Sequence, residues 1–375
     1  MHLYVHVPFC RSRCSYCGFV SYPYDRGRVE DYLLALTEEI RVLGQRWQRP
    51  QISSLYVGGG TPSLLTPFEL EGIFRAIRDN FFVKPELELT LEGNPESMGE
   101  PDYLGQLQSL GVNRLSLGLQ SLNNESLVFL DRRHTAEQGL EACRLAREAG
   151  FENLSVDLLW SIPGQDLSGW LFELKTLADL GIRHISCYAL GLEPGSVLEA
   201  RDRFGDVCWP SEEDQARMYL QGISLLREKG LRQYEVSNFA AKGFACRHNM
   251  GYWLGRDYLG FGPAAVSTVG TRRWKNPEGL QDYLKAPAGG RSRSGGEETG
   301  LREQINELLM LRLRTTRGLP LKEYFALAGR DLLVENRLLI GDLERNGLIV
   351  RQQGRLCLTP EGMLVSDSLI SRFFV

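Results

Sequence analysis

Three cysteines stand close together near the start of the chain. Cys10, Cys14 and Cys17 follow a C-x3-C-x2-C spacing, and the aromatic Tyr16 directly precedes the last of them. Thiols spaced this closely can converge on one metal centre. Three thiolates leave tetrahedral zinc one ligand short unless a fourth comes from elsewhere. On a four-iron cluster, three thiolates leave one iron without a protein ligand and open to a small chelating molecule. The spacing is consistent with either centre.

A glycine-rich segment, Gly58-Gly59-Gly60-Thr61-Pro62, follows the second apolar stretch of the sequence. Glycines allow the backbone to approach a ligand closely and to offer its N–H and C=O groups. The segment is not a phosphate-binding P-loop, because no Gly-Lys-Ser/Thr follows at the required spacing. By itself it indicates either a ligand contact or a tight turn.

Polar side chains end three of the expected strands. Glu92, Gln120 and Asp157 each fall at the carboxyl end of an alternating apolar segment, and Arg132 follows the second of these segments. A carboxylate in this position can accept hydrogen bonds from an ammonium group. Arg132 is a permanent cation that suits a carboxylate partner. The carboxyl ends of barrel strands are where α/β barrels build their sites, so we expect these residues to share one pocket.

Strands and helices alternate through the first two thirds of the chain, which predicts βαβ units with a parallel sheet. Several strands alternate strictly, as in Leu87-Glu88-Leu89-Thr90-Leu91-Glu92, so one face is apolar and the other small or polar. A polar face indicates a lumen that holds a ligand, or a sheet with one solvated face. We expect a partial (β/α)6 barrel. The strands are expected near 2–7, 52–58, 87–92, 113–119, 153–159 and 183–190. The helices are expected near 28–46, 67–80, 101–109, 123–149 (broken), 167–180 and 211–229.

The rest of the chain predicts a second, smaller domain. Residues 1–230 are expected to form the barrel domain and 231–285 a segment that follows it. Residues 286–300 are rich in Gly, Ser and Pro and read as a linker. Residues 301–375 combine helices with one β-hairpin, which predicts a mainly helical, winged-helix-like domain. Acidic residues on its central helix disfavour DNA binding.

Composition excludes several classes of protein. The chain has 375 residues and a formal net charge of −4, which argues against a nucleic-acid partner held by positive charge. No apolar run reaches the ~20 residues of a membrane span. The N-terminus carries no signal-peptide pattern, so we expect a cytoplasmic protein whose cysteines are thiols or metal ligands.

Taken together, these motifs resemble the radical S-adenosylmethionine (SAM) superfamily. The resemblance implies a [4Fe–4S] cluster held by Cys10, Cys14 and Cys17, with SAM chelating the fourth iron, and reductive cleavage of SAM as the chemistry. It also implies which residues contact SAM. They are Tyr4, Tyr16, Gly59, Gly60, Thr61, Glu92, Gln120, Arg132 and Asp157.

Within that superfamily the chain resembles the branch of oxygen-independent coproporphyrinogen III oxidases. The segments Tyr4–Cys10, Leu115–Ser121 and Val156–Leu158 carry the likeness, and the C-terminal domain also fits. The dehydrogenase of this branch has an extension before its first cluster cysteine and a fourth cysteine two residues after the third. Here Cys10 lies near the start, and Phe19 stands at the fourth position. Both departures favour the haem-chaperone group of the branch.

One later motif agrees with that group. Cys246-Arg247-His248-Asn249-Met250-Gly251-Tyr252-Trp253 resembles the group's H-N-x-x-Y-W motif, which is linked to haem. An imidazole can bind haem iron and aromatic rings can cover a porphyrin; alternatively, His248 caps a turn and the aromatics are core. We therefore expect a chaperone that binds the cluster, SAM and haem and passes haem to a haem-requiring client protein, such as one of the respiratory chain. The alternatives are a coproporphyrinogen III dehydrogenase or another radical SAM enzyme.

Overall fold

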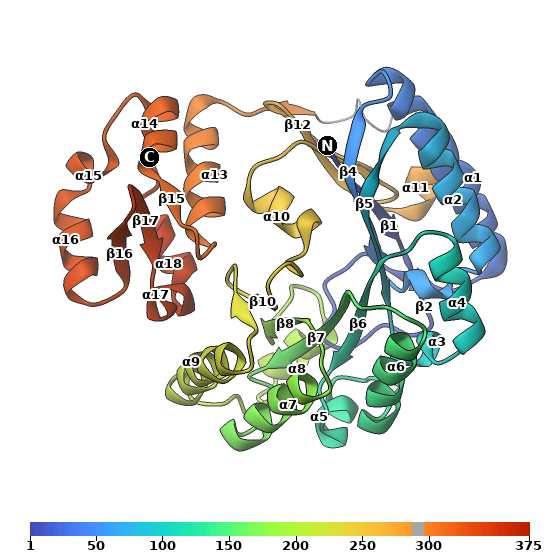
Figure 1. The fold of residues 1–375 in the computed structure, drawn as a ribbon, viewed down its shortest axis with the longest axis horizontal. Helices are drawn as coiled ribbons and strands as arrows, with labels where there is room; N and C mark the ends of the chain where they lie inside the picture. Colours follow the sequence, from blue (N-terminus) through green and yellow to red (C-terminus); the bar gives the residue numbers. More distant parts are fainter. Residues whose placement is uncertain (287–295) are drawn as a thin grey trace.

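A computed structural model describes residues 1–286 and 296–375. Within this part of the chain, seven parallel strands form the centre of one curved sheet (Figure 1). In spatial order they are β11 (Tyr258–Phe261), β1 (His2–Val7), β4 (Gln51–Gly59), β5 (Phe82–Gly93), β6 (Arg114–Gln120), β7 (Leu154–Trp160) and β8 (His184–Ala189).

The connecting helices cover the convex outer face of the sheet (Figure 1). Several begin with caps that the sequence supplies. Thr66, for example, accepts a hydrogen bond from the N–H of Glu69 while the Glu69 side chain accepts from the N–H of Thr66. The main helices are α1 (Arg26–Arg46), α2 (Pro67–Asn80), α4 (Pro101–Ser109), α5 (Asn124–Phe129), α6 (Ala136–Glu148), α7 (Leu167–Asp179) and α9 (Glu212–Glu228). Shorter ones are the 3-10 helix η1 (Pro62–Leu64), α3 (Pro95–Met98), α8 (Val197–Arg203) and α11 (Leu280–Lys285).

The alternation of apolar and polar residues explains which face of the sheet packs in the core and which faces the barrel interior. In β5, Leu89 and Leu91 are buried in the hydrophobic core, whereas Glu88 and Glu92, on the opposite face, point into the barrel. The six expected strands and the expected partial barrel are confirmed. The interior is polar, so the alternative of a sheet with one solvated face is not what the structure shows.

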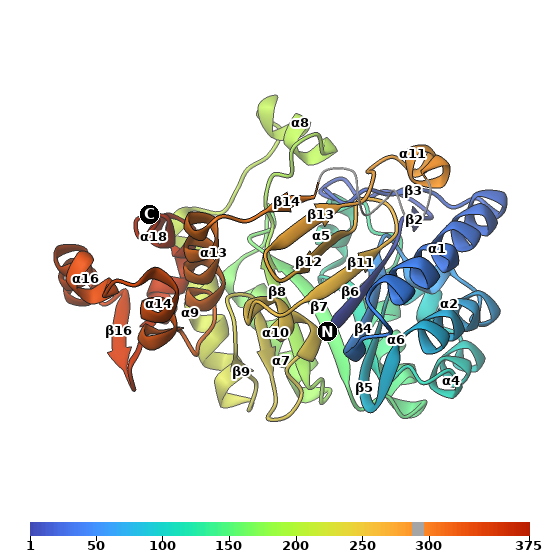
Figure 2. The ribbon, with the colours of Figure 1, turned by 90° about the horizontal axis from the view of Figure 1, so that it is seen from above.

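Residues 231–285 do more than follow the barrel, because they extend its sheet at both edges. β10 (Asn238–Ala240) pairs antiparallel with β8, and β9 (Arg232–Gln233) pairs with β10. At the other edge β11 pairs parallel with β1. It is followed by antiparallel β12 (Val266–Val269) and β13 (Arg272–Lys275), and then by β14 (Glu297–Glu298), which comes from the expected linker (Figure 2). The expected boundary at residue 230 therefore does not mark the end of the sheet.

Most of the expected linker, 287–295, lies outside the described residues. The C-terminal domain (orange to red in Figure 1) contacts the rest through α13 against α10 (Arg247–Trp253) and through α17 against α9. It consists of helices and a three-stranded sheet. The elements are α13 (Leu301–Leu313), β15 (Leu319–Pro320), α14 (Leu321–Ala328), α15 (Leu332–Glu335), α16 (Arg337–Arg345), β16 (Ile349–Gln352), β17 (Arg355–Leu358), α17 (Pro360–Leu364) and α18 (Ser366–Ser371).

The expected hairpin is thus present, and β15 adds a third strand to it. Among the described residues, none of the helices is both long and apolar enough to cross a membrane.

Candidate cofactor site

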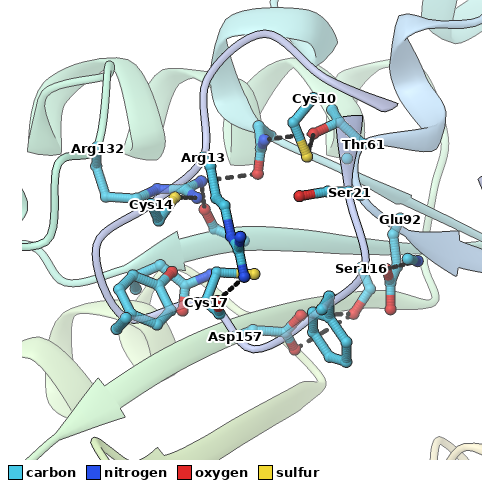
Figure 3. Close-up of a pocket in the computed structure, with 18 of the residues that line it drawn as sticks. Cys10, Arg13, Cys14, Cys17, Ser21, Thr61, Glu92, Ser116, Arg132 and Asp157 are labelled. Atoms are coloured by element: carbon cyan, nitrogen blue, oxygen red, sulfur yellow. Dashed lines mark hydrogen bonds between the residues drawn. The ribbon is translucent and has the colours of Figure 1, made fainter. Parts of the chain in front are cut away.

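A cavity of about 560 Å³ opens at the carboxyl ends of the parallel strands. Its wall brings together most of the side chains that the sequence analysis singled out (Figure 3). They come from the cysteine loop, from the carboxyl ends of β4, β5, β6 and β7, and from the loop between α5 and α6. These are Cys10, Cys14, Tyr16, Cys17, Gly59, Gly60, Thr61, Glu92, Gln120, Arg132 and Asp157. The topology explains the gathering, because parallel strands end at the same edge of a sheet.

The loop that carries the three cysteines lies across this cavity. It leaves the short strand β2 (Phe9–Cys10) and returns to β3 (Tyr22–Pro23), which pairs with β2. All three thiols are free and partly exposed to the cavity. Burial raises the pKa of Cys10 and Cys17, while a hydrogen bond from the Thr61 hydroxyl to Cys10 Sγ, 3.7 Å long, acts in the opposite direction.

The glycine segment Gly58–Gly60 lies close against the start of the cysteine loop. Gly59 has φ +113°, which favours glycine. A Cβ on Gly60 would stand 2.6 Å from the carbonyl oxygen of Phe9 and 2.9 Å from Cys10 Sγ. Only glycine therefore lets the segment lie against the first cysteine.

Glu92 is a buried acid on the cavity wall. Its carboxylate accepts hydrogen bonds from the Tyr56 hydroxyl at 2.7 Å and from the N–H of Gly59 at 3.0 Å. Burial raises the pKa of Glu92 to about 7, and the nearby charge of Asp157 adds to that shift. A buried acid of this kind is typical of a site that receives a cation.

Asp157 lies below the cysteine loop on β7 (Figure 3). It accepts from the Ser116 hydroxyl at 3.2 Å, and burial raises its pKa. Gln120 ends β6 with φ +70°, at a point where the register between β6 and β7 shifts. At this irregular strand end, Gln120 lines the cavity.

Arg132 joins the cysteine loop to the strands. Its guanidinium donates to Cys14 Sγ at 3.3 Å, to Asn94 Oδ1 at 2.7 Å and to the carbonyl oxygen of Gly118 at 2.8 Å. Its Nε is buried and has no partner among the described residues. The side chain therefore has a donor left for a further acceptor in the cavity.

Two expected site residues lie away from the cavity wall. The hydroxyl of Tyr4 is 3.0 Å from His6 Nδ1, inside the barrel. His248 is 1 % exposed, with Nδ1 2.8 Å from Ser54 Oγ and Nε2 2.9 Å from the Tyr252 hydroxyl. Of this motif, the neighbouring Asn249 is the part that reaches the cavity.

Sequence reasoning missed Arg114, the first residue of β6. It is 1 % exposed and lines the cavity, and its Nε and Nη1 have no hydrogen-bond partner among the described residues. An arginine inside an apolar strand segment gives no local signal of this role. Its place in the same alternation as Ser116, Gly118 and Gln120 does predict that it faces the lumen.

The donor set can be compared with the two metal centres that the spacing allows. Tetrahedral zinc needs a fourth ligand beside the three cysteines, and across residues 1–286 and 296–375 no three His, Cys, Asp or Glu side chains are grouped as ligands of a single ion. The other centre fits, because three thiols face one cavity, a glycine leaves room beside one of them and an unpartnered guanidinium nitrogen lies nearby.

The chain is similar to known proteins over most of its length. A model of the radical SAM superfamily matches residues 4–177, and one of the HemN C-terminal domain matches residues 301–365. A protein of Mycobacterium tuberculosis named heme chaperone HemW is 35% identical over 372 residues, covering 98% of this chain and 93% of the relative. This chain belongs to the HemW family of radical SAM proteins.

Other HemW relatives are similar over their whole length. The heme chaperone HemW of Bacillus subtilis is 33% identical over 375 residues, covering 99% of this chain and 98% of the relative. Among solved structures, HemN of Escherichia coli, described as a coproporphyrinogen III oxidase and radical SAM enzyme, has a TM-score of 0.85 at 24% identity. That match covers 100% of this chain and 89% of HemN. It confirms the fold, and the HemW relatives confirm the expected branch.

Proposed function

We propose that this protein is a haem chaperone that binds a [4Fe–4S] cluster, SAM and haem. In this role it passes haem to a haem-requiring client, such as a respiratory protein. The supporting observation is the cavity, where three free thiols and a buried set of charged and polar groups face one space. Full-length similarity to proteins named heme chaperones supports the haem part.

Each group of cavity residues has a separate task in this proposal. Cys10, Cys14 and Cys17 hold the cluster, which when bound supplies the electron that reduces SAM. Arg132 donates to the Cys14 sulfur and offsets the negative charge of the thiolates. The Thr61 hydroxyl donates a hydrogen bond to the Cys10 sulfur.

The opposite wall receives SAM. Glu92 accepts hydrogen bonds from its ammonium group, and the unpartnered Nε of Arg132 can donate to its carboxylate. Gly59 and Gly60 let the backbone approach the methionine part, while Gln120, Asp157 and Tyr16 surround the remainder. Tyr4 contributes to this site indirectly, through the hydrogen bond between its hydroxyl and His6.

We further propose that the protein works in the cytoplasm. In a reducing compartment cysteines stay reduced, and all eight are free here, including exposed Cys208.

The proposal is tested by reconstituting the full chain anaerobically with iron and sulfide and titrating haem by visible absorbance. We expect cluster content to be lost in a Cys10→Ala/Cys14→Ala/Cys17→Ala variant and kept in the matched control Cys208→Ala. The wild type should bind haem saturably and leave coproporphyrinogen III unconsumed. Absence of haem binding in every redox state would overturn the proposal, and decarboxylation of coproporphyrinogen III would make the protein a dehydrogenase.

A further inference from the structure

We infer that haem is held at the mouth of the cavity, over the cysteine loop and between Phe19 and Tyr188, and not at His248. The inference rests on the proposed function, because it takes haem as the ligand. It assigns that ligand to one surface of the protein and excludes histidine as its iron ligand.

The histidines of this protein are buried. The five histidines of the chain all lie within the described residues, and each is at most 9 % exposed. His248 is held at both ring nitrogens, by Ser54 and Tyr252. His184 is held in the same way by Ser155 and Tyr234. His6 is likewise held at both nitrogens, by Tyr4 and by a backbone carbonyl. His2 and His134 are buried as well.

A bond from haem iron to His248 would therefore need two changes. One hydrogen bond of the imidazole would have to break, and the ring would have to leave a site where it lies 5.1 Å from the Tyr56 ring and 4.8 Å from the Tyr252 ring, centroid to centroid. A group buried in this way supports the position of α10 and is not presented to a flat ligand.

The mouth of the cavity, by contrast, exposes aromatic surface. Phe19 is 63 % exposed and Tyr188 is 41 % exposed, and both line the cavity. Apolar Leu64 and Leu190 line the same cavity. Exposed aromatic rings beside a hollow mark a binding surface for an apolar ligand. A porphyrin has two apolar faces that can lie against such rings.

Charge at the mouth suits the acidic edge of haem. Exposed Arg11, Arg13 and Arg133 line the cavity, and guanidinium groups pair well with carboxylates such as the two haem propionates. Two exposed acids, Asp131 and Glu193, line it as well, beside the more buried Glu92, Glu96 and Asp157. Glu193 lies over Gly18, where an added Cβ would meet its Oε2 at 2.7 Å. The arginines on the cysteine loop therefore form the basic part of the rim.

The size of the cavity places haem at its rim. Single small-molecule sites occupy about 300–1,000 Å³, and this cavity of about 560 Å³ lies within that range. The cluster and SAM use that space in the proposed function. A third, larger ligand then sits outward of them, against the exposed rings of the mouth.

The test compares haem affinity in full-length protein reconstituted with its cluster and supplied with SAM. For Phe19→Ala/Tyr188→Ala we expect haem to bind about tenfold more weakly or worse, because two aromatic contacts are lost. The matched control is Phe68→Ala/Phe325→Ala, which removes two rings that are 86 % and 57 % exposed and do not line the cavity; we expect its affinity to match the wild type. Iron content and thermal melting check that each variant is folded and loaded.

Two further measurements separate the possible results. We expect metal-free protoporphyrin IX to bind within about tenfold of haem, since no histidine–iron bond contributes, and we expect the electron paramagnetic resonance spectrum of ferric haem to lack histidine ligation. Histidine ligation, or a loss of affinity in His248→Gln with none in Phe19→Ala/Tyr188→Ala, would overturn the site and leave the proposed function standing. If the wild type binds no haem, the proposed function fails and this site fails with it.

Discussion

The backbone N–H of His248 donates a hydrogen bond of 2.9 Å to Oε1 of Glu88, although the two residues lie 160 positions apart in the chain. The other carboxylate oxygen accepts from the N–H of Arg247, also at 2.9 Å. Glu88 on β5 thus fixes the first turn of α10, whose N–H groups have no partner inside the helix. The position of the His248 motif is set from the middle of the sheet.

Replacing Glu88 by Gln should loosen this attachment. An amide has one acceptor oxygen in place of two and is uncharged, so we expect the free energy of unfolding to fall by about 1–3 kcal/mol. Chemical denaturation of the apo protein measures it. The exposed neighbour Glu86→Gln is the control, with an expected change within about 0.5 kcal/mol. Equal stability of the two variants would contradict this role for Glu88.

Adding one methyl group at Gly60 should impair the cysteine loop. A Cβ there would stand 2.6 Å from the Phe9 carbonyl oxygen and 2.9 Å from Cys10 Sγ, so backbone or thiol must move. We expect Gly60→Ala to incorporate clearly less iron than the wild type after reconstitution. Gly72→Ala on α2 is the control, because nothing lies within 4 Å of its added Cβ. It should gain about 0.5–1 kcal/mol of stability and keep its iron; normal iron content in Gly60→Ala would show that the loop adapts.

SAM affinity should rise with pH around neutrality. Glu92 has a pKa of about 7, raised mainly by burial. If the ionised form accepts the ammonium group of SAM, affinity should fall as pH drops below 7, by up to about tenfold per unit. Isothermal titration between about pH 6 and pH 8 measures this. Glu92→Gln should bind more weakly and lose most of the slope, whereas an unchanged slope would assign the titration to another group.

Glu173 offers a pH effect on stability away from the cavity. It is 3 % exposed, accepts from the Ser121 hydroxyl at 2.5 Å, and burial raises its pKa to about 7. Because the folded-state pKa lies above the unfolded value, the folded protein binds more protons between these two values. Stability from this group is therefore present at low pH and lost as pH rises from about 4.5 to 7.

We accordingly expect Glu173→Gln to gain stability relative to the wild type as pH rises, by about 1–3 kcal/mol between acidic and mildly alkaline conditions. Denaturation curves at both ends of that interval provide the measurement. The exposed Glu141→Gln should show no such trend. A difference that stayed constant with pH would mean that Glu173 does not titrate in this interval.

The sequence predicted the elements whose pattern is local. Alternation in β5 and β6 assigned Leu91 to the core and Glu92 and Gln120 to the lumen, and the cysteine spacing located the loop. These inferences need only neighbours in the chain and the geometry of a strand.

Residues whose surroundings come from distant segments were not predictable in the same way. His248 is buried because Ser54 on β4 and Glu88 on β5 meet the start of α10, and nothing within its own motif encodes those partners. The sheet pairing of residues 231–285 is equally nonlocal.

The pairing of β1 with β11 also has a consequence during protein synthesis. Leu3 stands opposite Leu259, so one edge of β1 stays open until the ribosome has made and released more than two thirds of the chain. An unpaired central strand is an open template for pairing with other chains. Nascent chains that stop before Tyr258 should therefore depend most on chaperones that shield newly made polypeptides from aggregation.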